Sequence, residues 1–194
     1  MRLGLLGGSF NPIHRCHLSI ARSARQLLQL DRVLFIPTGD PPHKQPGTLA
    51  AASHRHRMVQ LAIQDTPEFA LTDIEIQRSG KSYSIDTVRA IQQEYGPDTV
   101  LFFIIGLDAF LDLPSWKEAD TLLKSCHFVV ISRPSTSFQA MAAIPLFRDV
   151  PQTTLTALDE VRQERADVAI TNGQALTFLR LPPCDVSASE IRAR

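Results

Sequence analysis

The sequence predicts an α/β protein with a Rossmann-like, doubly wound, mainly parallel sheet and helices on both of its faces. Short apolar runs typical of buried strands alternate along the 194 residues with longer segments of helical periodicity. The clearest run, Val100 to Ile105, is uninterrupted, which is typical of a strand covered on both faces. No internal repeat or low-complexity linker interrupts this pattern, so we expect one domain over residues 1–194.

The first half of the chain supplies the first expected strands and helices. Residues 2–6 form a short apolar run that ends at two glycines, and a second run, 33–36, ends at Pro37. Between them, 14–30 has apolar residues at roughly helical spacing. The remaining expectations are a helix at 53–63 capped by Ser53 with Met58, Leu61 and Ala62 on its apolar face, an alternating strand at 69–76, and a helix at 84–95 closed by Gly96-Pro97.

The second half continues the alternation, which favours right-handed βαβ units. The expected elements are a helix at 116–125, a buried strand at 127–132, a helix at 153–165, strands at 167–171 and 175–181 flanking Asn172-Gly173, and a short helix at 187–194. The Pro- and Thr-rich stretch 135–156 is the expected place for an insertion.

Composition excludes several classes of protein. Apolar residues make up 44% and charged residues 21%, as in ordinary globular proteins, which excludes wholesale disorder. The longest apolar run is far shorter than the ~18 residues of a membrane span, and the first residues lack the apolar region of a secretory signal. Three cysteines, odd in number and widely spaced, favour a reduced, cytoplasmic protein over a disulfide framework.

The charges balance overall but not along the chain. Twenty basic residues against twenty acidic ones argue against a bulk nucleic-acid or membrane-surface binder. Residues 1–60, however, hold eight Lys/Arg against two acids, a balance of +6, and five of the six histidines. This asymmetry is consistent with a local anion site, and equally with an uneven distribution of solvated surface charge.

The loop after the first expected strand is the candidate anion site. In doubly wound sheets, ligands bind beyond the carboxyl ends of the strands. The glycines let the backbone approach a ligand, and the following helix offers N–H groups with partial positive charge. His14 and His17 lie three residues apart, so both imidazoles project from one helical face. The pair could instead ligate a metal, but no third ligand at compatible spacing is evident, so we expect no protein metal site.

Residues 8–17, Gly-Ser-Phe-Asn-Pro-Ile-His-Arg-Cys-His, resemble the G-x-F-x-P-x-H-x-G-H signature of nucleotidylyltransferases, which have a Rossmann-like fold. Further segments follow the order typical of the bacterial nicotinate-nucleotide adenylyltransferase family. They are Pro-Pro-His-Lys at 41–44, Ser-Tyr-Ser-Ile-Asp-Thr at 82–87, Ile-Gly-Leu-Asp at 105–108, Ser-Trp at 115–116, Ser-Arg-Pro at 132–134 and Ser-Ala-Ser-Glu-Ile-Arg at 187–192. The resemblance covers nearly the whole chain, and the later motifs are more selective than the first.

The resemblance implies adenylyl transfer from ATP to nicotinate mononucleotide, a step of NAD biosynthesis, with no nucleic acid or membrane as partner. Mg²⁺ is expected to arrive bound to ATP, without dedicated protein ligands. The implied catalytic residues are His17, His14 and Lys44. The implied ATP-binding residues are Gly8, Ser9, Phe10, His14, His17, Gly106, Asp108, Ser189 and Arg192, the last two near 187–194. The implied acceptor-binding residues are His43, Lys44, Ser84, Ile85, Trp116 as a stacking partner, Lys117 and Arg133.

Structural roles remain open for several of these residues. Trp116 could anchor the core, and Asp108 could cap a helix. Lys44 could be a solvated loop lysine, and Arg133 could pair with a surface acid. The basic N-terminal third is nevertheless in keeping with a site that binds two polyanions, independently of the resemblance.

The chain departs from the family pattern at two places. Cys16 stands where the signature has Gly, and we expect its sulfur to pack inward as a small apolar group. Replacing Cys16 with Gly should then leave turnover within a few-fold. The chain also ends two residues after Arg192, whereas relatives usually continue through a longer helix, so that either the protein is short or a tail is omitted. Without a tail, we expect Ser189 and Arg192 to be loosely held.

Two other functions remain open on the sequence. The same ATP chemistry could use nicotinamide mononucleotide or phosphopantetheine as the acceptor. Alternatively, the chain could be a non-catalytic nucleotide sensor in which Cys16 and the early C-terminus mark lost activity. The motifs at 82–87 and 115–116 favour a pyridine acceptor over phosphopantetheine.

Overall fold

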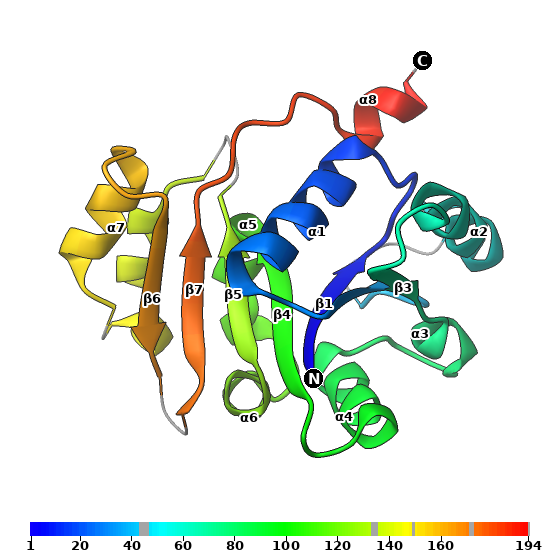
Figure 1. Cartoon of the computed structure of the whole chain (residues 1–194), viewed down its shortest axis with the longest axis horizontal. Coiled ribbons are helices and arrows are strands. Elements are labelled where there is room, and N and C mark those ends of the chain that lie inside the picture. Colours follow the sequence, from blue (N-terminus) through cyan, green and yellow to red (C-terminus); the bar gives the residue numbers. More distant parts are fainter. Residues whose placement is uncertain (43–46, 133–135, 149, 171–172, 194) are drawn as a thin grey trace. The chain divides into compact units, whose positions relative to one another are not determined.

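The computed structural model describes residues 1–42, 47–132, 136–148, 150–170 and 173–193 (Figure 1). These residues form two compact units, each described here by itself. Unit 1 comprises Met1–Leu101 together with Cys184–Arg194, and unit 2 comprises Phe102–Pro183. The expectation of one domain stays a prediction. None of the helices in the described ranges is long and apolar enough to cross a membrane.

Unit 1 is built on parallel strands in the order β3-β2-β1. β1 (Arg2–Gly8) pairs with β2 (Arg32–Pro37), and β2 pairs with β3 (Phe69–Leu71). Helix α1 (Arg15–Leu28) packs on β1 and β2, and α2 (Ala52–Ile63) packs on β2 and β3. The other elements that lie in unit 1 or begin there are α3 (Ile74–Gln77), α4 (Ser84–Tyr95), β4 (Val100–Gly106) and α8 (Ala188–Arg192).

Unit 2 has its strands in the order β4-β5-β7-β6. β4 and β7 (Ala175–Leu179) both pair parallel with β5 (His127–Ile131), and β6 (Arg165–Ala169) pairs antiparallel with β7. The helices are α5 (Leu107–Leu111), α6 (Ala119–Ser125) and α7 (Gln152–Asp159), with 3-10 turns at Leu113–Ser115, Phe138–Ala143 and Pro145–Phe147. Parallel strands joined through helices confirm the predicted α/β class.

The predicted elements with clear boundary residues agree best with the structure. Helix α4 spans the predicted residues, and Gly96 closes it with a left-handed φ of 85°. The antiparallel pairing of β6 with β7 agrees with the two predicted strands that flank Asn172-Gly173, although Asn172 lies outside the described residues. β1 continues through Gly7 and Gly8, which the sequence placed beyond the strand, because Gly8 still pairs with Pro37 of β2.

Two predictions about the region 53–76 were wrong. Helix α2 begins at Ala52, one residue before the predicted cap Ser53, and it buries Arg55, Val59 and Ile63 rather than Met58, Leu61 and Ala62. Leu61 is 49% exposed. The buried stripe contains an arginine, so a count of apolar residues selected the wrong face.

The predicted strand at 69–76 ends at Leu71, and helix α3 follows it. The Thr72 hydroxyl accepts a hydrogen bond from the Ile74 N–H at 3.3 Å, which starts a turn where alternation predicted a strand.

Three helices are shorter than their apolar periodicity predicted. Helix α1 ends at Leu28 because Gln29 has a left-handed φ of 51°. Helix α7 ends at Asp159, and Val161 has a φ of 58°, so the chain turns toward β6 well before the predicted end at residue 165. Helix α6 begins at Ala119 rather than at Trp116, which instead closes a 3-10 turn.

Candidate active site

The β1–α1 loop brings the two predicted histidines together. His14 is the N-cap of α1, with an extended backbone, and the helix is 14 residues long, so its first turn carries the partial positive charge that favours an anion. The ring centroids of His14 and His17 lie 3.9 Å apart. The structure therefore confirms that one helical end presents both imidazoles.

The hydrogen bonds of His17 define which ring nitrogen carries its proton. The His14 backbone N–H donates to Nδ1 of His17 at 3.2 Å. A nitrogen that accepts a hydrogen bond is deprotonated, so in the neutral ring Nε2 is the protonated nitrogen and acts as the donor. A neutral His17 can thus donate an N–H to a phosphate oxygen.

Phe10 supports His17 through its side chain. Its backbone is left-handed, with a φ of 44°, and its ring is 2% exposed. The Phe10 ring meets His17 edge-on, with centroids 5.1 Å apart. A Cβ on Gly8 would lie 3.2 Å from this ring, so the glycine leaves room for it. The resemblance implied only that Phe10 binds ATP, and the aromatic support of the histidine was missed.

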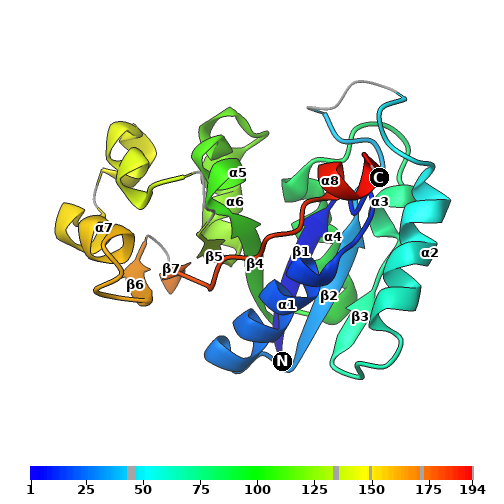
Figure 2. The ribbon, with the colours of Figure 1, turned by 90° about the horizontal axis from the view of Figure 1, so that it is seen from above.

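Helix α8 reaches the same loop. The Arg192 guanidinium donates to the backbone oxygen of Asn11 and, at 3.2 Å, to the Ser189 hydroxyl. Ser187 caps the helix together with the Glu190 carboxylate, which accepts the Ser187 N–H at 2.8 Å. Both Figure 1 and Figure 2 show α8 beside the end at which α1 begins. The residues predicted to bind ATP phosphates from the C-terminal segment are therefore next to the histidine loop.

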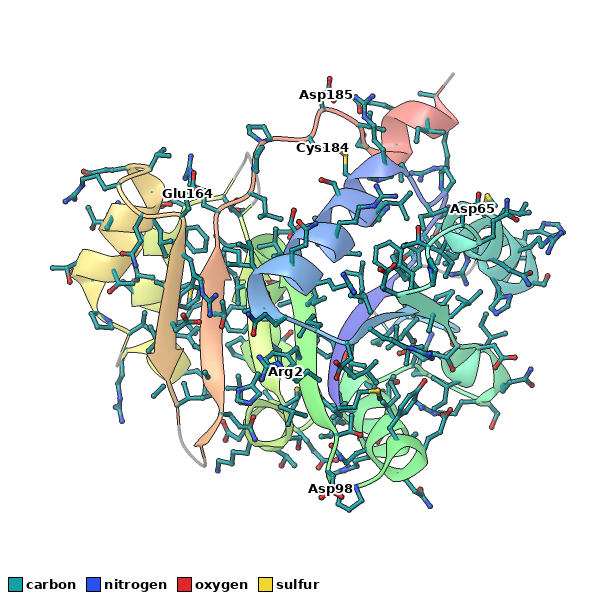
Figure 3. The ribbon with its side chains drawn as sticks, viewed as in Figure 1. Arg2, Asp65, Asp98, Glu164, Cys184 and Asp185 are labelled. Atoms are coloured by element: carbon teal, nitrogen blue, oxygen red, sulfur yellow. A yellow bond between two sulfur atoms is a disulfide. The ribbon has the colours of Figure 1, made fainter. Side chains whose placement is uncertain are left out.

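A disulfide between Cys16 and Cys184 fixes this segment, which corrects the prediction of reduced cysteines. The two Cα atoms lie 5.7 Å apart across a sequence separation of 168 residues. Cys16 is buried, as expected, but its sulfur bonds to another sulfur rather than packing as a free apolar group. An ion pair between Arg15 and Asp185 flanks the cross-link. Figure 3 labels Cys184 and Asp185 on the segment that leads into α8. The segment is therefore tied down, and the expectation that it would be loosely held was wrong.

Two of the predicted acceptor residues of unit 1 lie at the first turn of α4. Ser84 and Ile85 follow the extended N-cap Tyr83. The Ile85 side chain is fully buried, so only its backbone N–H can contribute to a ligand site. The 12-residue helix gives this end the positive partial charge expected for a carboxylate site.

Unit 2 holds the remaining described candidates. Trp116 is partly exposed and meets Phe103 edge-on at a centroid distance of 6.3 Å, whereas Leu113 nearby is fully buried, so Trp116 is not a core anchor. Lys117 is exposed beside it.

Two further candidates of unit 2 follow strand β4. Gly106 is the N-cap of α5, and Asp108 is exposed in the first turn of that helix rather than at its cap. The alternative reading of Asp108 as the capping residue is therefore wrong.

Three predicted residues, His43, Lys44 and Arg133, lie outside the described residues. Within the described ranges, the structure contains no group of three or more His, Cys, Asp or Glu side chains that could hold a metal ion. The donors gathered at the β1–α1 loop are imidazole, guanidinium and hydroxyl groups, which suit phosphate oxygens rather than Mg²⁺.

Comparison with known proteins defines first the class and then the family. Residues 5–194 match the cytidylyltransferase-like family model, so the chain is a nucleotidyltransferase of that class. A probable nicotinate-nucleotide adenylyltransferase of Geobacter metallireducens is 42% identical over 192 residues, covering 99% of this chain and 86% of the relative. One from Moorella thermoacetica is 36% identical, with coverage of 100% and 80%. The chain belongs to the nicotinate-nucleotide adenylyltransferase family.

The fold agrees with a solved structure of much lower sequence similarity. The nicotinic acid mononucleotide adenylyltransferase of Plasmodium falciparum, solved as a complex with NaAD, superimposes with a TM-score of 0.70 at 19% identity. The match covers 99% of this chain and 82% of that one. This likeness confirms the Rossmann-like α/β fold.

Proposed function

We propose that the protein transfers the adenylyl group of MgATP to nicotinate mononucleotide, giving nicotinate adenine dinucleotide and pyrophosphate. The observation that carries this proposal is the pair of imidazoles 3.9 Å apart at the N-terminus of α1, with Arg192 bonded to the same loop. These groups are N–H donors and positive charges, which a polyphosphate requires. The relatives at 36–49% identity carry the same activity in their names.

The reaction needs alignment and charge neutralisation rather than a general base. The 5′-phosphate of the acceptor is already ionised, so it attacks the α-phosphorus of ATP in line without losing a proton. The bond from the α-phosphorus to the bridging oxygen breaks, and pyrophosphate leaves with that electron pair. Negative charge grows on the transferred group and on the leaving oxygen. We assign the Nε2–H of His17 to this developing charge, with His14 beside it.

The other candidate residues are assigned to the remaining parts of the two substrates. Ser189 and Arg192 hold the β- and γ-phosphates, and Gly8, Ser9 and Phe10 shape the loop at the nucleotide. His43 and Lys44 are assigned to the phosphates, and Gly106 and Asp108 to the ATP nucleoside. Backbone N–H groups at Ser84, Ile85 and Lys117 are assigned to the pyridine carboxylate, Trp116 to stacking on the ring, and Arg133 to the acceptor.

Mg²⁺ belongs to this scheme as part of the substrate. Bound to the phosphate oxygens of ATP, it neutralises charge and keeps water as its remaining ligands. No nucleic acid or membrane takes part. We place the enzyme in the cytoplasm, a compartment in which the Cys16–Cys184 disulfide is unusual.

Pyrophosphate release tests the proposal directly. The purified protein is assayed with ATP and Mg²⁺ and, separately, with nicotinate mononucleotide, nicotinamide mononucleotide or phosphopantetheine. We expect the highest kcat/KM with nicotinate mononucleotide and formation of the dinucleotide in equal amount to pyrophosphate. If the protein binds ATP but releases no pyrophosphate with any of the acceptors, it is instead a nucleotide sensor. A higher kcat/KM with another acceptor would reassign the substrate.

A further inference from the structure

Arg55 of α2 is a charged residue that the proposed reaction does not use. Its side chain is 1% exposed and is the largest fully buried side chain among the described residues. A buried guanidinium is costly unless its donors are satisfied. The hydrogen bonds that satisfy it therefore indicate why this position holds an arginine.

The Arg55 guanidinium joins three segments that are distant in sequence. Nη1 donates to the Ser9 backbone oxygen at 2.8 Å, Nη2 donates to the Thr38 oxygen at 2.6 Å, and Nε donates to the Ala50 oxygen at 2.9 Å. Nη2 also reaches the Gly39 oxygen at 3.4 Å. The rigid, planar guanidinium of Arg55 thus fixes the spacing between Ser9 after β1, Thr38 after β2 and Ala50 before α2.

These segments are the ones that lead to the proposed phosphate contacts. Ser9 directly precedes Phe10, which supports His17. Ala50 donates its N–H to the Asn11 side chain at 3.2 Å, and the Asn11 backbone oxygen accepts Arg192. The bonds of Arg55 to Ser9 and Ala50 therefore connect to the loop that carries Phe10 and Asn11. The Thr38 N–H, beside the third contact, donates to the Gly8 oxygen at 2.9 Å.

The charge of Arg55 also matters for an anionic ligand. Carbonyl oxygens that gather beyond the ends of β1 and β2 carry partial negative charge, which opposes a polyphosphate at that edge of the sheet. The guanidinium neutralises these oxygens from inside the protein. Burial lowers the pKa of Arg55, and the charge of Glu75 opposes this in part. The guanidinium nevertheless stays a cation, because the ordinary pKa of arginine is far above neutral.

We propose that Arg55 is a positioning residue for adenylyl transfer: it sets the register of the β1 and β2 loops and neutralises their carbonyl groups, so that ATP is held in line for attack. This inference rests on the proposed function. Arg55 acts through the loops and does not touch the substrate. Its loss should therefore lower kcat more than it raises the KM for ATP.

The test compares Arg55→Met and Arg55→Lys with Arg57→Met. Arg57 lies on the same helix but is exposed, and it donates to the Gln60 side-chain oxygen at 2.8 Å, so its replacement controls for loss of a helix cation. Folding is checked by circular dichroism and thermal melting, and kcat is normalised to the fraction of folded protein. We expect Arg55→Met to lower kcat at least tenfold, Arg55→Lys to restore part of it, and Arg57→Met to leave kcat within twofold.

Chemical rescue separates positioning from simple stabilisation. In Arg55→Ala, millimolar methylguanidinium should occupy the cavity and raise kcat at least threefold, without effect on the wild type. If Arg55→Met keeps the wild-type kcat, or if activity falls only with the folded fraction and no rescue occurs, the inference is overturned.

A readout without turnover keeps this inference distinct from the proposed function. Hydrogen exchange at the amides of Thr38 and Ala50 should accelerate in Arg55→Met relative to Arg57→Met, because their loops lose the shared guanidinium. Unchanged exchange at both amides contradicts the positioning role, even if the wild type transfers adenylyl groups. If exchange is faster in Arg55→Met but the wild type releases no pyrophosphate, the proposed function is contradicted. In that case only the role of Arg55 in fixing the loop register is confirmed.

Discussion

The two units bury very different side chains. Among the described residues, unit 1 buries six polar or charged residues, namely Asn11, Arg55, Glu75, Ser82, Thr87 and Thr99, whereas unit 2 buries one, Thr177. Unit 2 instead buries seven phenylalanines, and unit 1 buries three. Both units have parallel strands, so the difference does not follow from the fold alone.

The difference shows how each unit fixes its loops. Apolar packing is largely non-directional, whereas a buried polar group requires a partner at a defined distance and angle. In unit 1 the Glu75 carboxylate accepts the Thr87 hydroxyl at 2.8 Å, and the Ser82 hydroxyl accepts the Asp40 N–H at 3.2 Å. Such bonds specify loop positions, which a reaction based on alignment requires.

Gly39→Ala should break the polar network of unit 1 most severely. A Cβ at this position would lie 2.1 Å from the backbone oxygen of Glu75, which cannot move without moving α3. We expect the free energy of unfolding to fall by about 4 kcal/mol, measured by urea denaturation. Gly7→Ala is the matched control, because a Cβ there meets nothing within 4 Å, and it should change stability by less than about 0.5 kcal/mol. Equal effects of the two substitutions would contradict this packing.

Cys184→Ser should remove the covalent tie of the C-terminal segment. The cross-link spans 168 residues, so its loss should lower the free energy of unfolding by about 3 kcal/mol without reductant. With reductant, the wild type and the variant should become nearly equal in stability. Alkylation before reduction should label neither Cys16 nor Cys184 of the wild type. Equal stability without reductant would show that the disulfide does not contribute.

Glu75→Gln should remove a pH dependence that belongs to unit 1. Burial raises the pKa of the Glu75 carboxyl above its ordinary value, while hydrogen bonds from Thr87 and Ser82 lower it. A raised folded pKa means that the folded state holds the proton longer, so this contribution to stability is present below the ordinary pKa and is lost as the pH rises through the folded pKa. The wild type should therefore lose stability relative to Glu75→Gln as the pH rises from 4 toward neutral. A difference that grows in the opposite direction would contradict the raised pKa.

Trp116→Ala tests unit 2, and of these substitutions it should lower the free energy of unfolding least. Trp116 is partly exposed and touches Phe103 by its edge, so its loss removes little core. We expect the KM for nicotinate mononucleotide to rise about tenfold and the KM for ATP to stay within twofold, since stacking is worth about 1 kcal/mol or more. Trp116→Phe should retain most of the acceptor affinity. A selective rise in the KM for ATP would remove Trp116 from the acceptor site.

The sequence predicts the fold and the histidine pair because their signals are local. Strand runs, the closing Gly96 and the spacing of His14 and His17 all follow from a few neighbouring residues. The disulfide was missed because its cysteines are far apart in sequence, and their proximity depends on α8 folding back to α1.

Arg55 was missed for another reason. An arginine in a helix is ordinarily solvated, and only the convergence of Ser9, Thr38 and Ala50 gives it buried partners. Fixed tertiary partners of polar groups are not visible in periodicity, so the supporting network of unit 1 could not be predicted.

We propose that the imidazoles at the start of α1 stabilise the charge that develops during adenylyl transfer. The most direct measurement is steady-state kinetics of His17→Ala with ATP, Mg²⁺ and nicotinate mononucleotide. We expect the kcat of this variant to be lower by about 100-fold, with the KM for the mononucleotide within threefold of the wild type. A folded variant with the wild-type kcat would contradict it.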